Sequence, residues 1–464
     1  MNRDVIIFLE YGFFAIALIG AYVLLLFFYS SVLVRTYVFL GILPLICVFF
    51  SLRVAGIEAS PEKTYFLALL PMLIYKVFFK TDRTDIWYIP KNISKAFGLF
   101  VVVMVVAQTV NEGMKIPPST AVYLAGLLGK GLIVYFVVRI VDNERKLEFC
   151  LKNVVVSLFI IQALSWCEIC FARDFYFFRM EYLRFIIPLS EFTPLGNPNL
   201  LARYIIILYP FSALGLYYFK KNSLSYKIAL ANIVGVALLI VATLSRAGMI
   251  AFIIQAGMIL YYNRKSLSER SRSFIPVALA VTVFFFVVFG GVMIERFTKM
   301  YTDLYSPVAA MSDRSFMEIN LRMRTWLASI RIIGDYPLTG VALSNLEETM
   351  INYGSVKIVG YFEGTEVITI HGSILRFLVL GGVFAGIAFV SLAFKYLKLL
   401  YQKYKSEGRS RPDVLMAYAF ISAAGVFLAS LAADPLYLNI FWFTAGMALA
   451  ANIIGRQEEK NEDM

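Results

Sequence analysis

The strongest constraint on this chain is a series of apolar stretches, each about twenty residues long and nearly free of charge. As a helix, such a stretch matches the hydrocarbon core of a bilayer, which is about 30 Å thick. Only 16% of the residues are charged, against roughly 25% in a typical soluble protein, and the mean hydropathy is +0.75. The in-out alternation of membrane β-barrel strands is missing. The sequence therefore predicts an all-α, polytopic transmembrane helical bundle.

The apolar stretches predict about twelve or thirteen spans. The candidate segments are residues 5–28, 32–52, 64–80, 96–112, 119–140, 150–172, 199–219, 227–244, 246–262, 274–294, 372–396, 413–433 and 436–454. Residues 5–52 could hold two spans, or one span and a re-entrant segment. The side of the membrane on which the chain begins is therefore left open.

The second half of the chain can be oriented from its basic loops. Lys and Arg residues are concentrated in three short loops, at 220–227, 263–273 and 401–412. Such loops are typically cytoplasmic, so we expect interval 295–371 and interval 173–198 on the opposite side. This topology explains much of the net charge of +12. The lipid bilayer is therefore the expected partner, and a nucleic acid is not.

Interval 295–371 is unusually long for a loop of a helical bundle, since connections above about 12–15 residues are uncommon unless they are functional or disordered. It contains aromatic and aliphatic residues throughout, which argues against disorder. Within it, residues 315–334 carry an apolar stripe at helical spacing. The stripe consists of Met323, Trp326, Leu327, Ile330 and Ile333. We expect a small helical extracytoplasmic cap, with this helix ending before Pro337.

These expectations divide the chain into four parts. Residues 1–172 hold the N-terminal transmembrane helices, and residues 173–294 hold the central ones with a Ser-Arg motif. Residues 295–371 are expected to form the large extracytoplasmic loop or cap. Residues 372–464 hold the C-terminal transmembrane helices and a short cytoplasmic tail.

His371 is the only histidine in the chain, and it immediately precedes an apolar run. Histidine is the one side chain whose unperturbed pKa lies near neutrality. If the protein transfers protons at neutral pH, His371 is the first candidate for the base. Taken alone, the position favours a histidine that caps a helix at the membrane interface.

Three arginines and two asparagines fall on the same predicted side of the membrane. Arg246 stands between two spans, where a guanidinium could bind a phosphate through paired hydrogen bonds or could simply snorkel to the surface. Helical geometry places Arg322 beside the apolar stripe of the cap helix and Arg324 further from it. A solvated face is the alternative for both. Asn197 and Asn199 precede and open a span, where a helix cap is the ordinary role.

The four cysteines give no sign of a metal site. All of them, Cys47, Cys150, Cys167 and Cys170, lie in or beside apolar segments. The last two have the spacing C-x-x-C, but no second pair or histidine cluster accompanies them, and structural zinc needs four such ligands. We expect buried thiols at a helix end and no metal.

Four motifs taken in order resemble the O-antigen ligase and polymerase superfamily of bacterial inner-membrane glycosyltransferases. They are Gly196-Asn197-Pro198-Asn199, Thr243-Leu244-Ser245-Arg246-Ala247-Gly248, Arg322-Met323-Arg324-Thr325-Trp326 with the exit Pro337-Leu338-Thr339-Gly340, and His371 leading to Gly381-Gly382. The resemblance covers about residues 195–395. Two positions depart from the family pattern. Gly372 stands where Asn or Ser often follows the histidine, and Ala342 stands where a second glycine commonly follows the exit.

The resemblance implies a cofactor-free, metal-independent transfer of a glycan from an undecaprenyl diphosphate carrier at the periplasmic face. It implies that Arg246 and Arg322 bind the donor diphosphate and stabilise the leaving group. His371 would be the general base that takes the proton of the acceptor hydroxyl, and the donor anomeric centre would be inverted. Arg324, Asn197 and Asn199 would be further substrate contacts.

Several functions remain open within and outside this resemblance. An O-antigen ligase would use lipid A-core as the acceptor, a polymerase another lipid-linked repeat, and a protein O-oligosaccharyltransferase a Ser or Thr side chain. We favour the ligase slightly. A membrane transporter is the more distant alternative, but the chain has no convincing internal repeat of the kind common in transporters. Its ionisable residues within spans, such as Glu10 and Lys130, trace no pathway.

Overall fold

The computed structural model describes most of the chain from residue 89 onward. The described residues are 52–54, 57–59, 89–171, 198–243, 245–264, 314–355, 370, 372–406, 410–431, 436 and 438–462. Predicted spans 5–28, 64–80 and 274–294 lie outside them, as does nearly all of 32–52. The sequence did not predict the short antiparallel pair of β1 (Leu52–Val54) and β2 (Ile57–Ala59), in which Leu52 is paired with Ala59.

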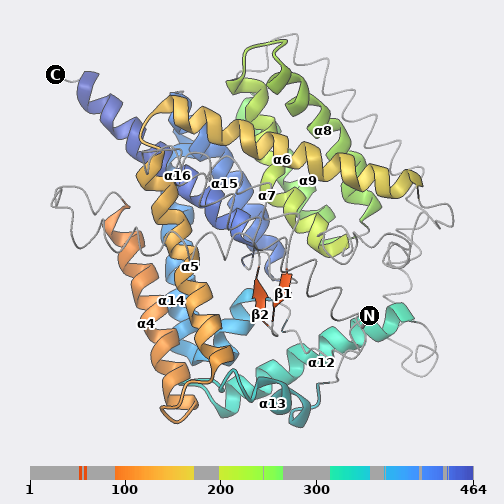
Figure 1. The fold of residues 1–464 in the computed structure, drawn as a ribbon, viewed down its shortest axis with the longest axis vertical. Coiled ribbons are helices and arrows are strands. Elements are labelled where there is room, and N and C mark those ends of the chain that lie inside the picture. Colours follow the sequence, from red (N-terminus) through yellow and green to blue (C-terminus); the bar gives the residue numbers. More distant parts are fainter. Residues whose placement is uncertain are drawn as a thin grey trace, which may run out of the picture.

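The described part of the chain is an all-α helical bundle apart from that strand pair (Figure 1). Its helices are α4 (Lys91–Asn111), α5 (Pro118–Ile140), α6 (Glu144–Phe171), α7 (Pro198–Tyr218), α8 (Leu224–Ala242), α9 (Arg246–Asn263), α12 (Arg314–Asp335), α13 (Leu346–Asn352), α14 (Ser373–Lys405), α15 (Arg411–Ala429) and α16 (Asn439–Glu462). Five of them, α4, α5, α7, α14 and α15, are long and apolar enough to cross a membrane. The prediction of a polytopic membrane bundle is confirmed.

A proline in the middle of α7 explains how three helices are joined. Pro210 has no N–H, so the carbonyl oxygen of Ile206 loses its partner within the helix. In an apolar layer an unpaired carbonyl is costly. Gln255 of α9 supplies the missing donor, with its Nε2 2.9 Å from the Ile206 oxygen. Gly425 of α15 leaves the room for this side chain, because a Cβ there would lie 2.2 Å from Gln255 Nε2.

A second group of buried amides joins α6, α7 and α8. Gln162 Nε2 donates to Asn232 Oδ1 over 3.1 Å. Asn232 Nδ2 in turn donates to the Val155 carbonyl at 2.8 Å and to Ser212 Oγ at 3.0 Å. All four groups are buried away from the cap. Within a lipid bilayer no hydrophobic force drives helices together, so hydrogen bonds between helices contribute to their association.

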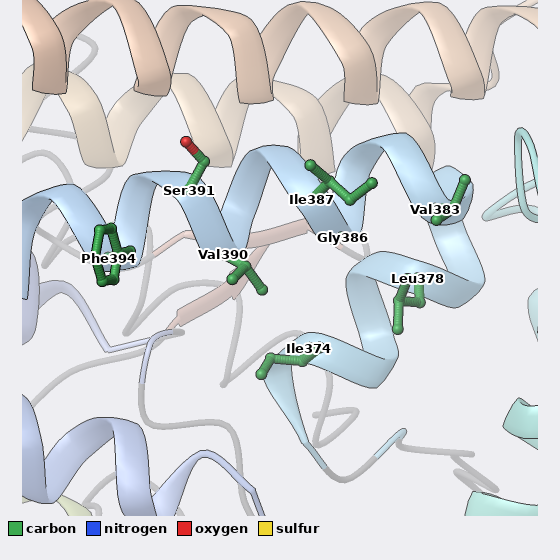
Figure 2. Close-up of a pocket in the computed structure, with 8 residues that line it drawn as sticks. All are labelled: Ile374, Leu378, Val383, Gly386, Ile387, Val390, Ser391 and Phe394. Atoms are coloured by element: carbon green, nitrogen blue, oxygen red, sulfur yellow. The ribbon is translucent and has the colours of Figure 1, made fainter.

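Helix α14 differs from the single span that the sequence predicts from residue 372. Gly382 has φ 67° and ψ −169°, which interrupts the helix, and only glycine adopts such a conformation without strain. Residues 373–381 form a first arm that folds back along the second arm, residues 383–405 (Figure 2). The rings of Phe377 and Phe389, one from each arm, are 4.6 Å apart between centroids.

The cap consists of α12 and α13, which lie across the end of the bundle beside the turn between α4 and α5 (Figure 1). The predicted helix and its end before Pro337 are confirmed by α12. The apolar stripe of this helix is only partly buried, since Leu327 and Ile330 are 50% and 58% exposed. The buried row contains Ala328 and Ile332 instead. Small residues in this row allow close packing on the first arm of α14, which apolar spacing alone does not reveal.

Candidate active site

The starts of α7 and α9 and the end of α15 lie at the same end of the bundle. Helices α7 and α9 run parallel, since Gly248 packs against Ala202 and Gln255 contacts Ile206. Helices α9 and α15 run antiparallel, because Gln255 contacts the Ile421 carbonyl and Asn263 Nδ2 donates to the hydroxyl of Tyr418, nearer the start of α15. The beginning of α9, with Arg246, therefore lies toward the end of α15 at Ser430.

Arg246 is the first residue of α9, directly after the N-cap residue Ser245. The Ser245 amide donates to Thr243 Oγ1 over 3.3 Å, which fixes the chain just before the helix. Gly248 allows α9 to approach α7, because a Cβ at this glycine would lie 2.8 Å from the Cβ of Ala202. The side chain of Arg246 lies outside the described residues. Its backbone stands at a helix N-terminus, where the helix dipole favours anions.

The first turn of α7 carries Asn199, which is half-buried. Asn197 lies outside the described residues. Because Ala202 in the next turn contacts Gly248, the two motifs that contain Asn199 and Arg246 meet in space. The sequence predicted only that both motifs lie on the same side of the membrane. The structure shows in addition that their helices touch at Gly248 and Ala202.

His371 itself lies outside the described residues, but the residues on both sides of it are described. Ile370 is 5% exposed and belongs to the cap core with Ala328 and Ile332 of α12. On the other side, the Ser373 amide donates to the carbonyl of Ser430 at the end of α15 over 3.2 Å. The chain around His371 is thus held between the cap core and the end of α15.

Gly372 explains one departure from the family pattern. Its φ is 111° and its ψ is 115°, a backbone conformation that residues other than glycine rarely adopt. A Cβ there would also lie 3.3 Å from the Leu431 carbonyl oxygen. An Asn or Ser at this position would be strained in this backbone, so glycine fits the chain as it is folded here.

The two cap arginines occupy different sides of α12. Arg324 is exposed, in agreement with the predicted outward direction. The side chain of Arg322 lies outside the described residues, but position 322 falls in the helical row of Ser329 and Ile333, seven and eleven residues further on. Ser329 is buried and Ile333 packs against the cap core.

The exit of the cap helix fits into the break in α14. The Val341 amide donates to the Val379 carbonyl at 2.8 Å, and the Val383 amide donates to the Pro337 carbonyl at 2.7 Å. In an unbroken helix the Val383 amide would bond the Val379 carbonyl. One helical hydrogen bond is thus exchanged for two bonds to the cap exit. Gly340, with φ 67°, permits this approach, since its Cβ would lie 2.2 Å from the Val379 oxygen.

The end of α4 contributes a contact that sequence reasoning missed. The side-chain amide of Gln108 is fully buried. Its Nε2 donates to the carbonyls of Val341 at 2.9 Å and Leu380 at 2.5 Å, and its Oε1 accepts from the Leu343 amide at 2.8 Å. Asn111 Nδ2 donates to the Thr339 carbonyl at 2.8 Å. The sequence feature that could have indicated this contact is the cluster of polar residues, Gln108, Asn111 and Glu112, at the end of an apolar helix.

Glu112, just beyond α4, extends this contact. Its carboxylate accepts from Ser344 Oγ at 2.6 Å, from the Ser344 amide at 3.1 Å and from Thr120 Oγ1 at 2.8 Å. Partial desolvation raises the pKa of Glu112, but the hydrogen bonds from Ser344 and Thr120 outweigh it, and the pKa lies below the ordinary value of 4.5. Glu112 therefore binds the cap exit as a carboxylate.

A separate groove of about 490 Å³ lies between the two arms of α14 (Figure 2). Ile374 and Leu378 of the first arm face it, as do Val383, Ile387 and Val390 of the second. Apart from one serine hydroxyl its lining is hydrocarbon and glycine, and it contains no ionisable side chain. The groove itself therefore offers no group for acid–base chemistry. Among the described residues, no three His, Cys, Asp or Glu side chains form a group that could hold a metal ion.

Comparison with known proteins agrees with the motifs. Residues 231–390 match the family model Wzy_C, which is described as O-antigen ligase. The matched region contains Arg246, the cap helix α12, His371 and the break in α14. No curated protein matches the chain.

Proposed function

Because residues 231–390 place this chain in the O-antigen ligase and polymerase superfamily of membrane glycosyltransferases, we propose that it transfers a glycan from undecaprenyl diphosphate to an acceptor hydroxyl. The reaction takes place at the periplasmic face of the bacterial inner membrane. The preferred acceptor is lipid A-core, as in an O-antigen ligase. The basic loops near residues 220, 270 and 405 support this orientation, because they are typical of the cytoplasmic side.

One observation carries the proposal most directly. The beginning of α9 with Arg246, the beginning of α7 with Asn199, and the chain on either side of His371 all lie toward the end of α15. These segments are far apart in the sequence. Two of them, the start of α9 and the chain on either side of His371, belong to the region that matches the O-antigen ligase family, and their common position supports one shared site.

In this proposal Arg246 and Arg322 bind the donor diphosphate. Guanidinium groups bind phosphate oxygens through charge-assisted, paired hydrogen bonds. As the bond to the sugar breaks, negative charge grows on the diphosphate, and both cations stabilise it. Arg324 is an auxiliary contact, and Asn197 and Asn199 are further substrate contacts.

His371 acts as the general base. It takes the proton from the acceptor hydroxyl as the hydroxyl oxygen attacks the anomeric carbon of the donor sugar. The bond from that carbon to the diphosphate oxygen breaks, and undecaprenyl diphosphate leaves with the electron pair. This single in-line displacement inverts the anomeric centre and uses neither a metal nor a cofactor.

Two related reactions use the same machinery with another acceptor. A polymerase would transfer the glycan to a second lipid-linked repeat, and a protein O-oligosaccharyltransferase would transfer it to a Ser or Thr hydroxyl. The family match is to a family of enzymes, so it gives no support to the transporter hypothesis.

The test is transfer by purified protein in liposomes that contain an undecaprenyl-diphosphate-linked glycan and one acceptor at a time. We expect product with lipid A-core and none with His371→Ala, at equal amounts of inserted protein. Product only with a second lipid-linked repeat would identify a polymerase. Full transfer by His371→Ala would refute the assignment of the base.

A further inference from the structure

We infer that the polar end of α4, formed by Gln108, Asn111 and Glu112, positions the cap on α14 for glycan transfer, with Gln108 as the central positioning residue. The inference rests on the proposed function, because the segments that Gln108 joins carry Arg322 and His371. It assigns a role to α4, which lies outside the matched region 231–390.

Two segments meet at the side chain of Gln108, the end of the first arm of α14 and the cap exit. Near the break at Gly382, the Leu380 carbonyl accepts from Gln108 Nε2 at 2.5 Å. The cap exit has no regular secondary structure at residues 340–342, although these residues are buried. Its Val341 carbonyl and Leu343 amide bond the same side-chain amide. Buried backbone groups need partners, and one amide supplies three.

The Gln108 amide joins segments that adjoin Arg322 and His371. The cap exit begins immediately after α12, the helix that carries Arg322. The first arm of α14 begins two residues after His371. Gln108 bonds both the exit and the end of the first arm. Phe100, two turns earlier on α4, contacts both arms, with ring centroids 4.9 Å from Phe377 and 5.7 Å from Phe389.

Asn111 and Glu112, the rest of the polar end of α4, bind the same exit. Asn111 holds the carbonyl of Thr339, and Glu112 holds both the hydroxyl and the amide of Ser344. Residues 339–344 are therefore fixed at several points along one helix end. A reaction that needs an arginine and a base at a defined separation loses rate when their supports shift by about an ångström. The end of α4 therefore sets this separation together with the apolar cap core.

The experiment compares Gln108→Leu with Gln162→Leu in the full-length protein. Gln162 is a matched control, because it is also a buried glutamine that hydrogen-bonds a neighbouring helix, but it lies in the α6–α8 contact away from the cap. Two quantities are measured. Hydrogen–deuterium exchange of residues 337–344 reports whether the exit stays docked, and the kinetics of glycan transfer report whether the site is aligned.

For Gln108→Leu we expect faster exchange at residues 337–344 and a fall in kcat of about ten- to a hundredfold, with KM for the donor changed less than threefold. Gln162→Leu should lower the melting temperature but leave kcat per folded molecule within twofold. Two further variants guard against a failure of Gln108→Leu to fold. Asn111→Ala removes only the bond to Thr339 and should give an intermediate loss of kcat. Gln108→Glu keeps the acceptor for Leu343 but sets a carboxylate against the Val341 and Leu380 carbonyls, so its loss of kcat should be at least as large as that of Gln108→Leu.

Unchanged exchange at residues 337–344 in Gln108→Leu and Gln108→Glu would overturn the inference, because the amide would then not hold the exit. Faster exchange with unchanged kcat would overturn the positioning role. An equal loss of kcat in Gln162→Leu would show that general destabilisation is the cause. If the wild-type protein transfers no glycan, the proposed function fails, whereas the exchange result still decides whether Gln108 holds the cap.

Discussion

Replacing Gly382 by alanine tests whether the break in α14 has the conformation described here. The φ of Gly382 is 67°, and an L-residue held in the left-handed region costs roughly 1–2 kcal/mol. A Cβ would also lie 2.1 Å from the Leu338 carbonyl oxygen and 2.7 Å from the Thr339 nitrogen. Both are backbone atoms that cannot rotate away, so the exit must move.

Movement of the exit removes the hydrogen bonds from Val341 to Val379 and from Val383 to Pro337. Each is worth about 0.5–1.5 kcal/mol net. Together with the backbone cost, we expect Gly382→Ala to lower the free energy of unfolding by about 2–5 kcal/mol, a large effect for one methyl group. Thermal unfolding of the purified protein in detergent measures it.

Gly98→Ala is the matched control. Gly98 lies within α4, and no atom would lie within 4 Å of a Cβ there. Because alanine is the better helix former by about 1 kcal/mol, this variant should be as stable as the wild type or slightly more stable. If Gly382→Ala unfolds at the same temperature as Gly98→Ala, the break and the docked exit described here are wrong.

Three further predictions concern other parts of the molecule. Gln255→Leu should lower the free energy of unfolding by about 1–3 kcal/mol, because it leaves the buried Ile206 carbonyl unpaired. In a Pro210→Ala background, which restores the missing N–H, the loss should be smaller. If a double-mutant cycle of melting temperatures shows no coupling between the two sites, the pairing is wrong. Because the pKa of Glu112 is lowered, its carboxylate stabilises the fold above about pH 4.5, and this contribution is lost as the pH falls through the lowered pKa. The melting temperatures of wild type and Glu112→Gln should therefore converge in acid. A constant difference from pH 7 to pH 3 would contradict the assignment. Arg322→Ala should reduce glycan transfer more than Arg324→Ala, because Arg324 is exposed; the reverse ranking in the transfer assay would exchange their roles.

The sequence predicted the spanning helices well, because hydropathy reports directly on the length of an apolar segment. The match is close for α5, predicted at 119–140 and observed at Pro118–Ile140. Hydropathy could not predict the break in α14, since both of its arms are apolar. The pair Gly381-Gly382 was visible as a motif, but a glycine adopts a left-handed conformation only where the tertiary structure requires it. Here the requirement comes from Leu338, forty-four residues earlier.

The sequence could predict that the segments carrying the candidate residues share one end of the bundle. The contact between Gly248 and Ala202 agrees with that prediction. The contacts of Gln108 were not predictable, because its three partners are backbone groups far away in the sequence, and backbone groups leave no pattern in side-chain chemistry. The buried row of α12 was missed for a related reason. Small residues such as Ala328 pack well without adding to an apolar stripe.

The break at Gly382 also decides how α14 fits the bilayer. As one continuous helix, its 33 residues would be about 50 Å long at 1.5 Å per residue, well beyond a hydrocarbon core of about 30 Å. The end of that length carries Lys395, Lys398, Lys403 and Lys405 and would extend into water. With the first arm folded back, the remaining arm at 383–405 is about 34 Å long. The glycine thus shortens α14 along its axis and keeps residues 373–381 beside the second arm.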